Sequence, residues 1–120
     1  MPTASGQEAS FALGQPNLTS NTDNNGGLSA ASLWSPTYVY SDGTKLFVSD
    51  SGNNRILVWN TIPTSSGQAA DTVIGQSNFT SSTSGLSPTS LSYPGGLAVA
   101  GGKLYITDSG NNRVLVMPAP

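Results

Sequence analysis

Four runs of consecutive apolar residues stand out from an otherwise polar chain. They are Leu-Phe-Val at 46–48, Ile-Leu-Val-Trp at 56–59, Leu-Tyr-Ile at 104–106 and Val-Leu-Val-Met at 114–117. Each run has the length of a strand, and residues that favour turns (Gly, Asn, Asp, Ser) lie between the runs. Because successive residues of a strand point to opposite faces, these runs predict strands that are covered on both faces.

The chain carries one unit twice. The sequence Asp50-Ser51-Gly52-Asn53-Asn54-Arg55 returns unchanged 58 residues later, as Asp108-Ser109-Gly110-Asn111-Asn112-Arg113. Near the N-terminus the matching residues are instead 61 apart, as Asn17 and Asn78 are. The two units therefore differ in length by three residues between about 21 and 32. Surface loops tolerate such a change.

Several short strands follow one another in each unit. We expect them at residues 38–41, 45–49, 55–59 and 71–74, and again at 96–99, 103–107 and 113–117. Residues 9–13 match 71–74 and predict one more strand. Short connections make neighbouring strands antiparallel. A sandwich would leave one face of each sheet in water, and a parallel sheet needs helical crossovers, for which no helical period is present. The pattern therefore predicts an all-β fold of small antiparallel sheets stacked face to face, the blades of a β-propeller.

Two stretches of the chain resemble the signature of the NHL repeat. Residues 45–56 and 103–114 each consist of an apolar strand, Asp, a small residue, Gly-Asn-Asn-Arg and a second apolar strand. The resemblance implies a propeller with four-stranded blades, typically six of them. The connections at 15–35 and 76–93 are longer than the family pattern.

Two blades cannot close a ring, so the chain is expected to assemble with copies of itself. We interpret residues 1–120 as one unit, with a first blade at 36–75 and a second blade at 94–117 that lacks its outer strand. Residues 1–15 would then donate an outer strand to the neighbouring chain and cover its exposed edge. The resemblance favours a homotrimer of six blades, and a dimer or a tetramer stays open. The alternative is a fragment or an engineered piece of a larger NHL propeller, derived from a hydrolase- or lyase-type enzyme.

Charge and composition narrow the possible partners and chemistry. Only 8% of the residues are charged, and the four basic ones (Lys45, Arg55, Lys103 and Arg113) occupy equivalent positions of the two units. This pattern argues against nucleic acid and against anionic membranes, which both require clustered basic residues. The chain has no His and no Cys, so the commonest general base and metal ligand are missing. We therefore predict no catalytic residues, no metal and no cofactor. No signal peptide or membrane-spanning stretch is visible, and the compartment stays open.

The repeated polar turn is interpreted as a structural motif. Its members are Asp50, Gly52, Asn53, Asn54 and Arg55, with Asp108, Gly110, Asn111, Asn112 and Arg113 in the second unit. The carboxylates are expected to accept backbone N–H bonds within the turn, and the arginines to bond carbonyls or the same carboxylate. The glycines are expected to take a positive φ. The turn lacks the glycine spacing and the distal Glu of a calcium loop.

A ligand could bind on the side of the long loops. Trp34, Tyr93, Asn53 and Asn111 are the candidate residues there, on a surface rich in uncharged polar side chains. Such a surface suits a neutral glycan or a peptide; the alternative is that Trp34 and Tyr93 pack between blades. The predicted function is a non-enzymatic, self-assembling scaffold or binding module.

Overall fold

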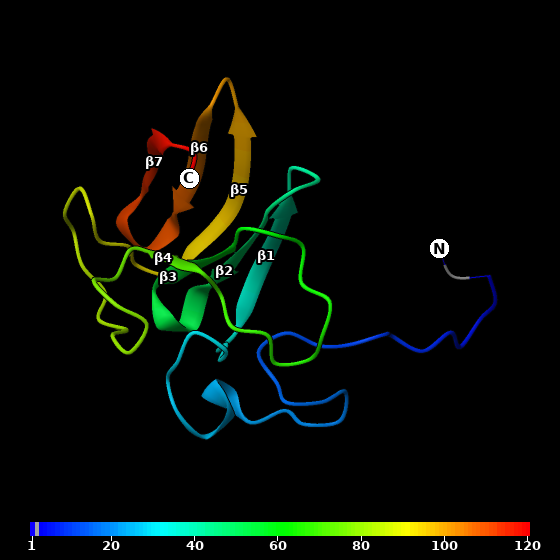
Figure 1. The fold of residues 1–120 in the computed structure, drawn as a ribbon. Coiled ribbons are helices and arrows are strands. Elements are labelled where there is room, and N and C mark those ends of the chain that lie inside the picture. The colour runs from blue at the N-terminus through cyan, green and yellow to red at the C-terminus, as the bar shows by residue number, and fades with distance from the viewer. Residues whose placement is uncertain (2) are drawn as a thin grey trace.

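The computed structural model describes residue 1 and residues 3–120. Their strands form two antiparallel sheets (Figure 1). The first sheet has the order β1-β2-β3-β4, with β1 at Pro36–Ser41, β2 at Leu46–Asp50, β3 at Arg55–Trp59 and β4 at Thr72–Ile74. The second has the order β5-β6-β7, with β5 at Pro94–Ala100, β6 at Lys103–Asp108 and β7 at Arg113–Pro118. The prediction of an all-β fold of antiparallel strands is confirmed.

Three short 3-10 turns complete the secondary structure of the described residues: η1 at Asp23–Gly26, η2 at Ser51–Asn53 and η3 at Ser109–Asn111. The last two occupy the repeated polar turn, between β2 and β3 and between β6 and β7. Among residues 1 and 3–120 no helix is long and apolar enough to span a bilayer.

The two sheets repeat one another in register as well as in sequence. Leu46 lies opposite Trp59 across β2 and β3, and Leu104 lies opposite Met117 across β6 and β7. Each sheet also has an irregularity near the start of its first strand, after Pro36 and after Pro94. Because the register fixes which side chains share a face, the two sheets present equivalent faces to their surroundings.

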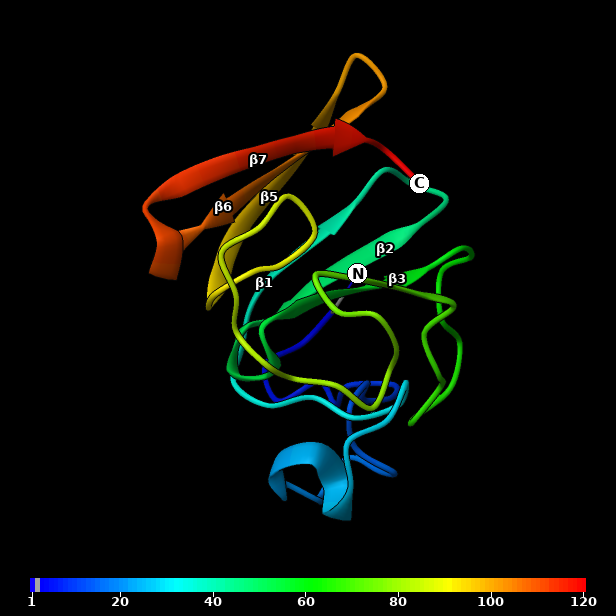
Figure 2. The same ribbon diagram turned by 90° about the vertical axis from the view of Figure 1, so that its left-hand side faces the viewer.

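The sheets stack face to face, and the main core lies between them (Figure 2). Phe47, Ile56 and Val58 of the first sheet belong to the same buried cluster as Leu97, Leu104 and Ile106 of the second. Full burial of one such side chain stabilises the fold by roughly 1.5–3 kcal/mol. This cluster accounts for one of the two apolar faces of each sheet.

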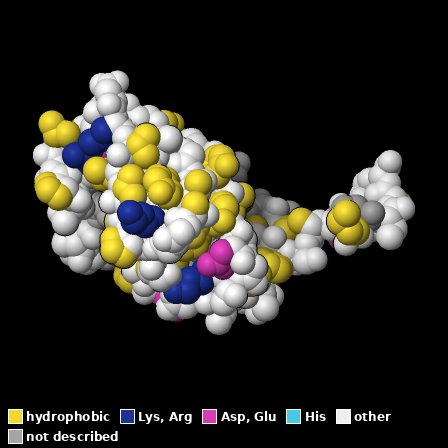
Figure 3. Space-filling view, turned by 90° about the horizontal axis from the view of Figure 1, so that it is seen from above, with side chains coloured by type: hydrophobic (Ala, Val, Ile, Leu, Met, Phe, Trp, Pro, Cys, Tyr) yellow, Lys and Arg dark blue, Asp and Glu magenta, His cyan; other side chains and the backbone are white. Residues whose placement is uncertain are grey.

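The two remaining faces are covered to different degrees. Val48, Leu57 and Trp59 on the far side of the first sheet are buried, with Leu13, Leu33 and Phe79 packed against them. On the far side of the second sheet, Val114 and Val116 are 58% and 51% exposed, whereas their counterparts Ile56 and Val58 are fully buried. Seen from above, hydrophobic side chains gather on the body of the molecule, interrupted by a few charged groups (Figure 3).

The strand predicted at residues 9–13 does not form in the single chain. Ala12 is held by other bonds: its N–H donates to Ser66 Oγ (3.1 Å), and its carbonyl accepts the N–H of Gly67 (3.0 Å). This agrees with the expectation that residues 9–13 have no partner strand in their own chain, because a strand requires a paired neighbour and they pair with none of the described strands. Donation to a second chain stays a prediction.

Candidate functional site

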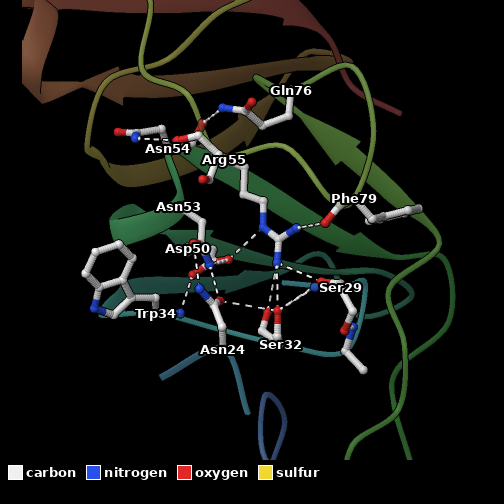
Figure 4. A network of polar contacts seen from close by, with 12 residues as sticks. Asn24, Ser29, Ser32, Trp34, Asp50, Asn53, Asn54, Arg55, Gln76 and Phe79 are labelled. Atoms are coloured by element: carbon white, nitrogen blue, oxygen red, sulfur yellow. Dashed lines mark hydrogen bonds and ion pairs between the residues drawn. The ribbon is translucent and has the colours of Figure 1, made fainter. Parts of the chain in front are cut away.

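The first polar turn is built around a buried ion pair between Asp50 and Arg55 (Figure 4). Arg55 Nε lies 2.7 Å from Asp50 Oδ2, and both side chains are fully buried. Asn53 Nδ2 donates to the same oxygen (2.8 Å), and the backbone N–H of Trp34 donates to Asp50 Oδ1 (2.7 Å). These three partners satisfy the carboxylate within the protein. Its one backbone N–H donor lies in the loop before β1 and not within the turn, where such donors were predicted.

The guanidinium of Arg55 fastens two long loops to this turn. Nη2 donates to the carbonyls of Ser29 (2.8 Å) and Ser32 (2.9 Å), in the loop before β1. Nη1 donates to the carbonyl of Phe79 (2.8 Å), in the loop after β4. Arg55 was predicted to bond carbonyls or the same aspartate, and it bonds both. Removing Asp50 would leave a buried, uncompensated charge, the costly case for an ion pair.

The second polar turn repeats this arrangement with one difference. Asp108 accepts the N–H of Ser92 (2.7 Å), Asn111 Nδ2 (2.8 Å) and Arg113 Nε (2.7 Å). Arg113 Nη2 donates to the carbonyls of Ser87 (2.6 Å) and Ser90 (3.0 Å). The Arg113 side chain is 25% exposed, however, and within the described chain its Nη1 has no acceptor equivalent to the Phe79 carbonyl.

The ionisation of Asp108 follows from these contacts. Burial alone would raise the pKa of its carboxyl, but the Ser92 N–H, the Asn111 amide and the Arg113 guanidinium outweigh burial and lower the pKa below the ordinary value. A carboxyl with a lowered pKa stays ionised at neutral pH and is a poor general acid. The chemistry of this turn is therefore that of an anchor.

The prediction of a positive φ at Gly52 and Gly110 is wrong. The left-handed residues of the turns are Asn54 and Asn112, with φ of 54° and 55°. The glycines are needed for space instead: a Cβ at Gly52 would lie 2.6 Å from the Trp34 carbonyl oxygen, and a Cβ at Gly110 would lie 2.7 Å from that of Ser92. The loop before each sheet thus approaches the turn too closely for a side chain.

Asn54 has a role that its sequence context did not reveal. Its Nδ2 donates to the carbonyl of Ser82 (3.0 Å), and its Oδ1 accepts the N–H of Tyr93 (2.8 Å). Its carbonyl accepts Gln76 Nε2 (2.9 Å). The residue therefore joins the first sheet's turn to the loop that leads into the second sheet. Only its place in a repeated Asn-Asn pair hinted at this.

The candidate ligand-face residues lie in two different environments. Trp34 and Tyr93 are 47% and 51% exposed. Asn53 is buried, and its side chain bonds Asn24 and Asp50. Asn111 is half-buried and donates to the Gly85 carbonyl and to Asp108. The structure thus leaves the two aromatic rings accessible, while the two asparagine side chains take part in the anchors.

No set of three or more His, Cys, Asp or Glu side chains within residues 1 and 3–120 is grouped so as to hold a metal ion. The carboxylates at the ends of β2 and β6, those of Asp50 and Asp108, already pair with Arg55 and Arg113.

Small antiparallel sheets that stack face to face and carry matching polar turns fit the blades of a partial β-propeller. Residues 91–117 match the family model of the NHL repeat. This match spans β5, β6 and most of β7 and confirms the resemblance read from the turn motif. None of the curated proteins matches the chain.

Proposed function

We propose that the chain is a building block of a β-propeller, which completes its ring by stacking with copies of itself and works as a non-enzymatic scaffold or binding module. The observation that carries the proposal is the open far face of the second sheet. Tyr105, Val114 and Val116 on this face are the repeat equivalents of Phe47, Ile56 and Val58, which pack between the two sheets.

The first sheet offers the complementary face. Val39, Leu46 and Val48 are the equivalents of Leu97, Leu104 and Ile106, the other half of the core between the sheets. Val39 is 61% exposed. The contact that already exists within the chain can therefore recur between chains, head to tail. A head-to-tail contact makes a ring when its rotation closes. Three chains with six blades are favoured by the NHL resemblance, ahead of a dimer or a tetramer.

The absence of enzymatic activity is part of the proposal. The aspartates at the ends of β2 and β6 are committed to ion pairs, and the chain has no His or Cys for acid–base, nucleophilic or metal chemistry. Two further acids lie at the ends of strands: Asp42 sits in the β1–β2 turn and accepts the N–H groups of Thr44 and Lys45, and Asp71, just before β4, accepts the N–H of Asn60.

The decisive experiment is the mass of the protein in solution by light scattering. We expect three times the chain mass for the wild type and the mass of one chain for V116K, because a lysine would bury a charge in the contact. L86K is the matched control: Leu86 is 74% exposed but lies in a loop outside both faces. A wild-type protein that stays monomeric at high concentration would refute self-assembly and favour the larger-propeller alternative.

A ligand role for the loop face rests on the accessible rings of Trp34 and Tyr93. Aromatic rings beside uncharged polar groups suit a neutral glycan or a peptide. Binding to a glycan array should be lost in W34A and Y93A, both checked for unchanged mass. Equal binding by the wild type and both variants would exclude these rings as the site.

A further inference from the structure

A pocket beside the first sheet is formed by residues that correspond, in the first unit, to the residues that bind Asn54 in the second. This pocket has a volume of about 380 Å³ and is lined by residues that include Gly14, Gln15, Asn21, Leu33 and Ser35. We call it the Gly14 pocket. Its equivalents by position, 61 or 58 residues further along, are Gly75, Gln76, Ser82, Leu91 and Tyr93, called the Gly75 pocket.

In the Gly75 pocket three of these residues hold Asn54. The backbone carbonyl of Ser82 accepts a hydrogen bond from Asn54 Nδ2, and the backbone N–H of Tyr93 donates to Asn54 Oδ1. Gln76 Nε2 donates to the Asn54 carbonyl. Gly75 leaves room for this contact: a Cβ there would lie 3.1 Å from the Asn54 oxygen. An asparagine in the left-handed conformation is therefore the residue that this kind of pocket accepts.

The Gly14 pocket already has the same shape. Gly14 and Gly75 have φ of 83° and 91°. A Cβ on either would lie 2.6 Å from Cδ1 of the leucine beneath it, Leu33 or Leu91. Ser35 and Tyr93 share the left-handed conformation, with φ of 50° and 48°.

The glutamines of the two pockets also behave alike. Gln15 Nε2 donates to the Thr22 carbonyl (2.8 Å), as Gln76 Nε2 does to the Thr83 carbonyl (2.9 Å). Gln15 Oε1 is a buried polar atom without a hydrogen-bond partner among the described residues. The pocket wall is thus formed before any second chain arrives, which reduces the entropy that binding has to overcome.

The matching asparagine is Asn112, at the other end of the same chain. Its φ and ψ are 55° and 42°, against 54° and 45° for Asn54. The arginine that follows each asparagine can be compared in the same way. Arg55 Nη1 donates to the Phe79 carbonyl. The residue that corresponds to Phe79 in the first unit is Leu18, 61 residues earlier, so the Leu18 carbonyl is the matching acceptor for Arg113.

We infer that Asn112 of one copy occupies the Gly14 pocket of the next copy, and that residues 11–13 of that next copy pair with the free edge of β7. Gln15 then donates to the Asn112 carbonyl, and Arg113 donates to the carbonyl of Leu18, which covers its exposed guanidinium. The inference rests on the proposed self-assembly and names the segments that join.

The backbone around Ala12 is compatible with this pairing. Ala12 uses its N–H and carbonyl for Ser66 and Gly67 of its own chain. Backbone groups of successive strand residues point to opposite edges, so once residues 11–13 are paired as a strand, those of Phe11 and Leu13 would face away from that contact. The β3–β4 register, Val58 opposite Thr72 and Ile56 opposite Ile74, transfers to Val116 opposite Phe11 and Val114 opposite Leu13.

Disulfide cross-linking tests the register directly, because the chain has no native cysteine. Facing strand residues have Cα atoms roughly 4.5–5.5 Å apart, within the range that a disulfide spans. F11C/V116C should therefore form disulfides between chains and give covalent oligomers on a non-reducing gel. V58C/T72C is the matched control, which should form the same cross-strand disulfide within one chain. F11C/V114C, two residues out of register, should cross-link weakly.

The same variants distinguish a failure of the strand pairing from a failure of the proposed self-assembly. Their mass is first measured with the cysteines reduced. A reduced F11C/V116C protein that assembles but forms no disulfide would overturn the strand pairing and leave self-assembly intact. A reduced protein that is monomeric, together with a monomeric wild type, would overturn both.

The pocket itself is tested by N112G, which keeps the left-handed backbone and removes the side chain. Two lost hydrogen bonds should weaken each contact between chains about tenfold, seen as dissociation at higher protein concentration. N25G is the control, because Asn25 is an exposed left-handed asparagine outside the pocket lining. Assembly of N112G at the wild-type concentration would overturn the role of Asn112.

Discussion

At the scale of single residues, the polar turns are positions where space and hydrogen bonding fix the amino acid. Gly52 meets the Trp34 carbonyl and ring, so G52A must displace the loop before β1. We expect the free energy of unfolding to fall by about 1–3 kcal/mol, measured by chemical denaturation. G27A is the control: nothing lies within 4 Å of a Cβ there, and its backbone is extended at φ 176°. An equal loss in both variants would contradict the steric argument.

The ionisation of two aspartates also belongs to this scale. The pKa of Asp42 is lowered by the N–H groups of Lys45 and Thr44, and that of Asp108 is lowered by its hydrogen bonds and Arg113 in spite of burial. A carboxyl whose pKa is lower in the folded state stabilises the fold above its unfolded pKa of about 3.9, and this stabilisation is lost as the pH falls through the folded-state pKa.

We therefore expect the free energy of unfolding to decrease as the pH is lowered below about 4, and D42N to flatten this dependence without unfolding the protein at neutral pH. Denaturation curves of wild type and D42N between neutral and acidic pH measure both effects. A wild-type stability that does not change on acidification would contradict the assigned shifts.

At the scale of elements, strands were predictable because their apolar runs are short and bounded by turn residues. The seven strands formed by residues 36–118 lie within a few residues of the predicted ranges. The strand at residues 9–13 stays a prediction, because repeat matching shows what a segment can pair with and its predicted partner is a second chain. The repeated Asp-Ser-Gly-Asn-Asn-Arg sequence identified the turn, and the aspartate–arginine pairing followed from charge.

The finer geometry of the turn could not be read from the sequence. The left-handed residue proved to be the second asparagine instead of the glycine, since the glycine is required by the approach of Trp34 or Ser92. Such contacts join residues about 18 apart through a loop whose path the sequence does not determine. The binding of Asn54 to Ser82 and Tyr93 depends on the packing of two sheets and was equally out of reach.

At the scale of the whole molecule, the first and second sheets pack against each other within the chain. The repeat equivalents of the two packed surfaces lie on the outer sides of the pair, one on each sheet. The sheet face with Val114 and Val116 and the Asn112 turn lie on the second sheet, while Val39 and the Gly14 pocket belong to the first. Apolar packing and polar anchoring therefore point in the same head-to-tail direction. Association of such faces would contribute to the folding stability of every chain, because only the folded chain presents them.

Thermal stability should consequently depend on protein concentration. Each tenfold increase in the concentration of partner chains adds up to about 1.4 kcal/mol per contact to the stability of the folded state, which for a domain of this size raises the melting temperature by several degrees. Melting curves recorded over a hundredfold range of concentration measure this shift. V116K should melt at one temperature throughout, because its chains do not associate. A wild type that behaves in the same way would show that the face with Val114 and Val116 stays uncovered in solution.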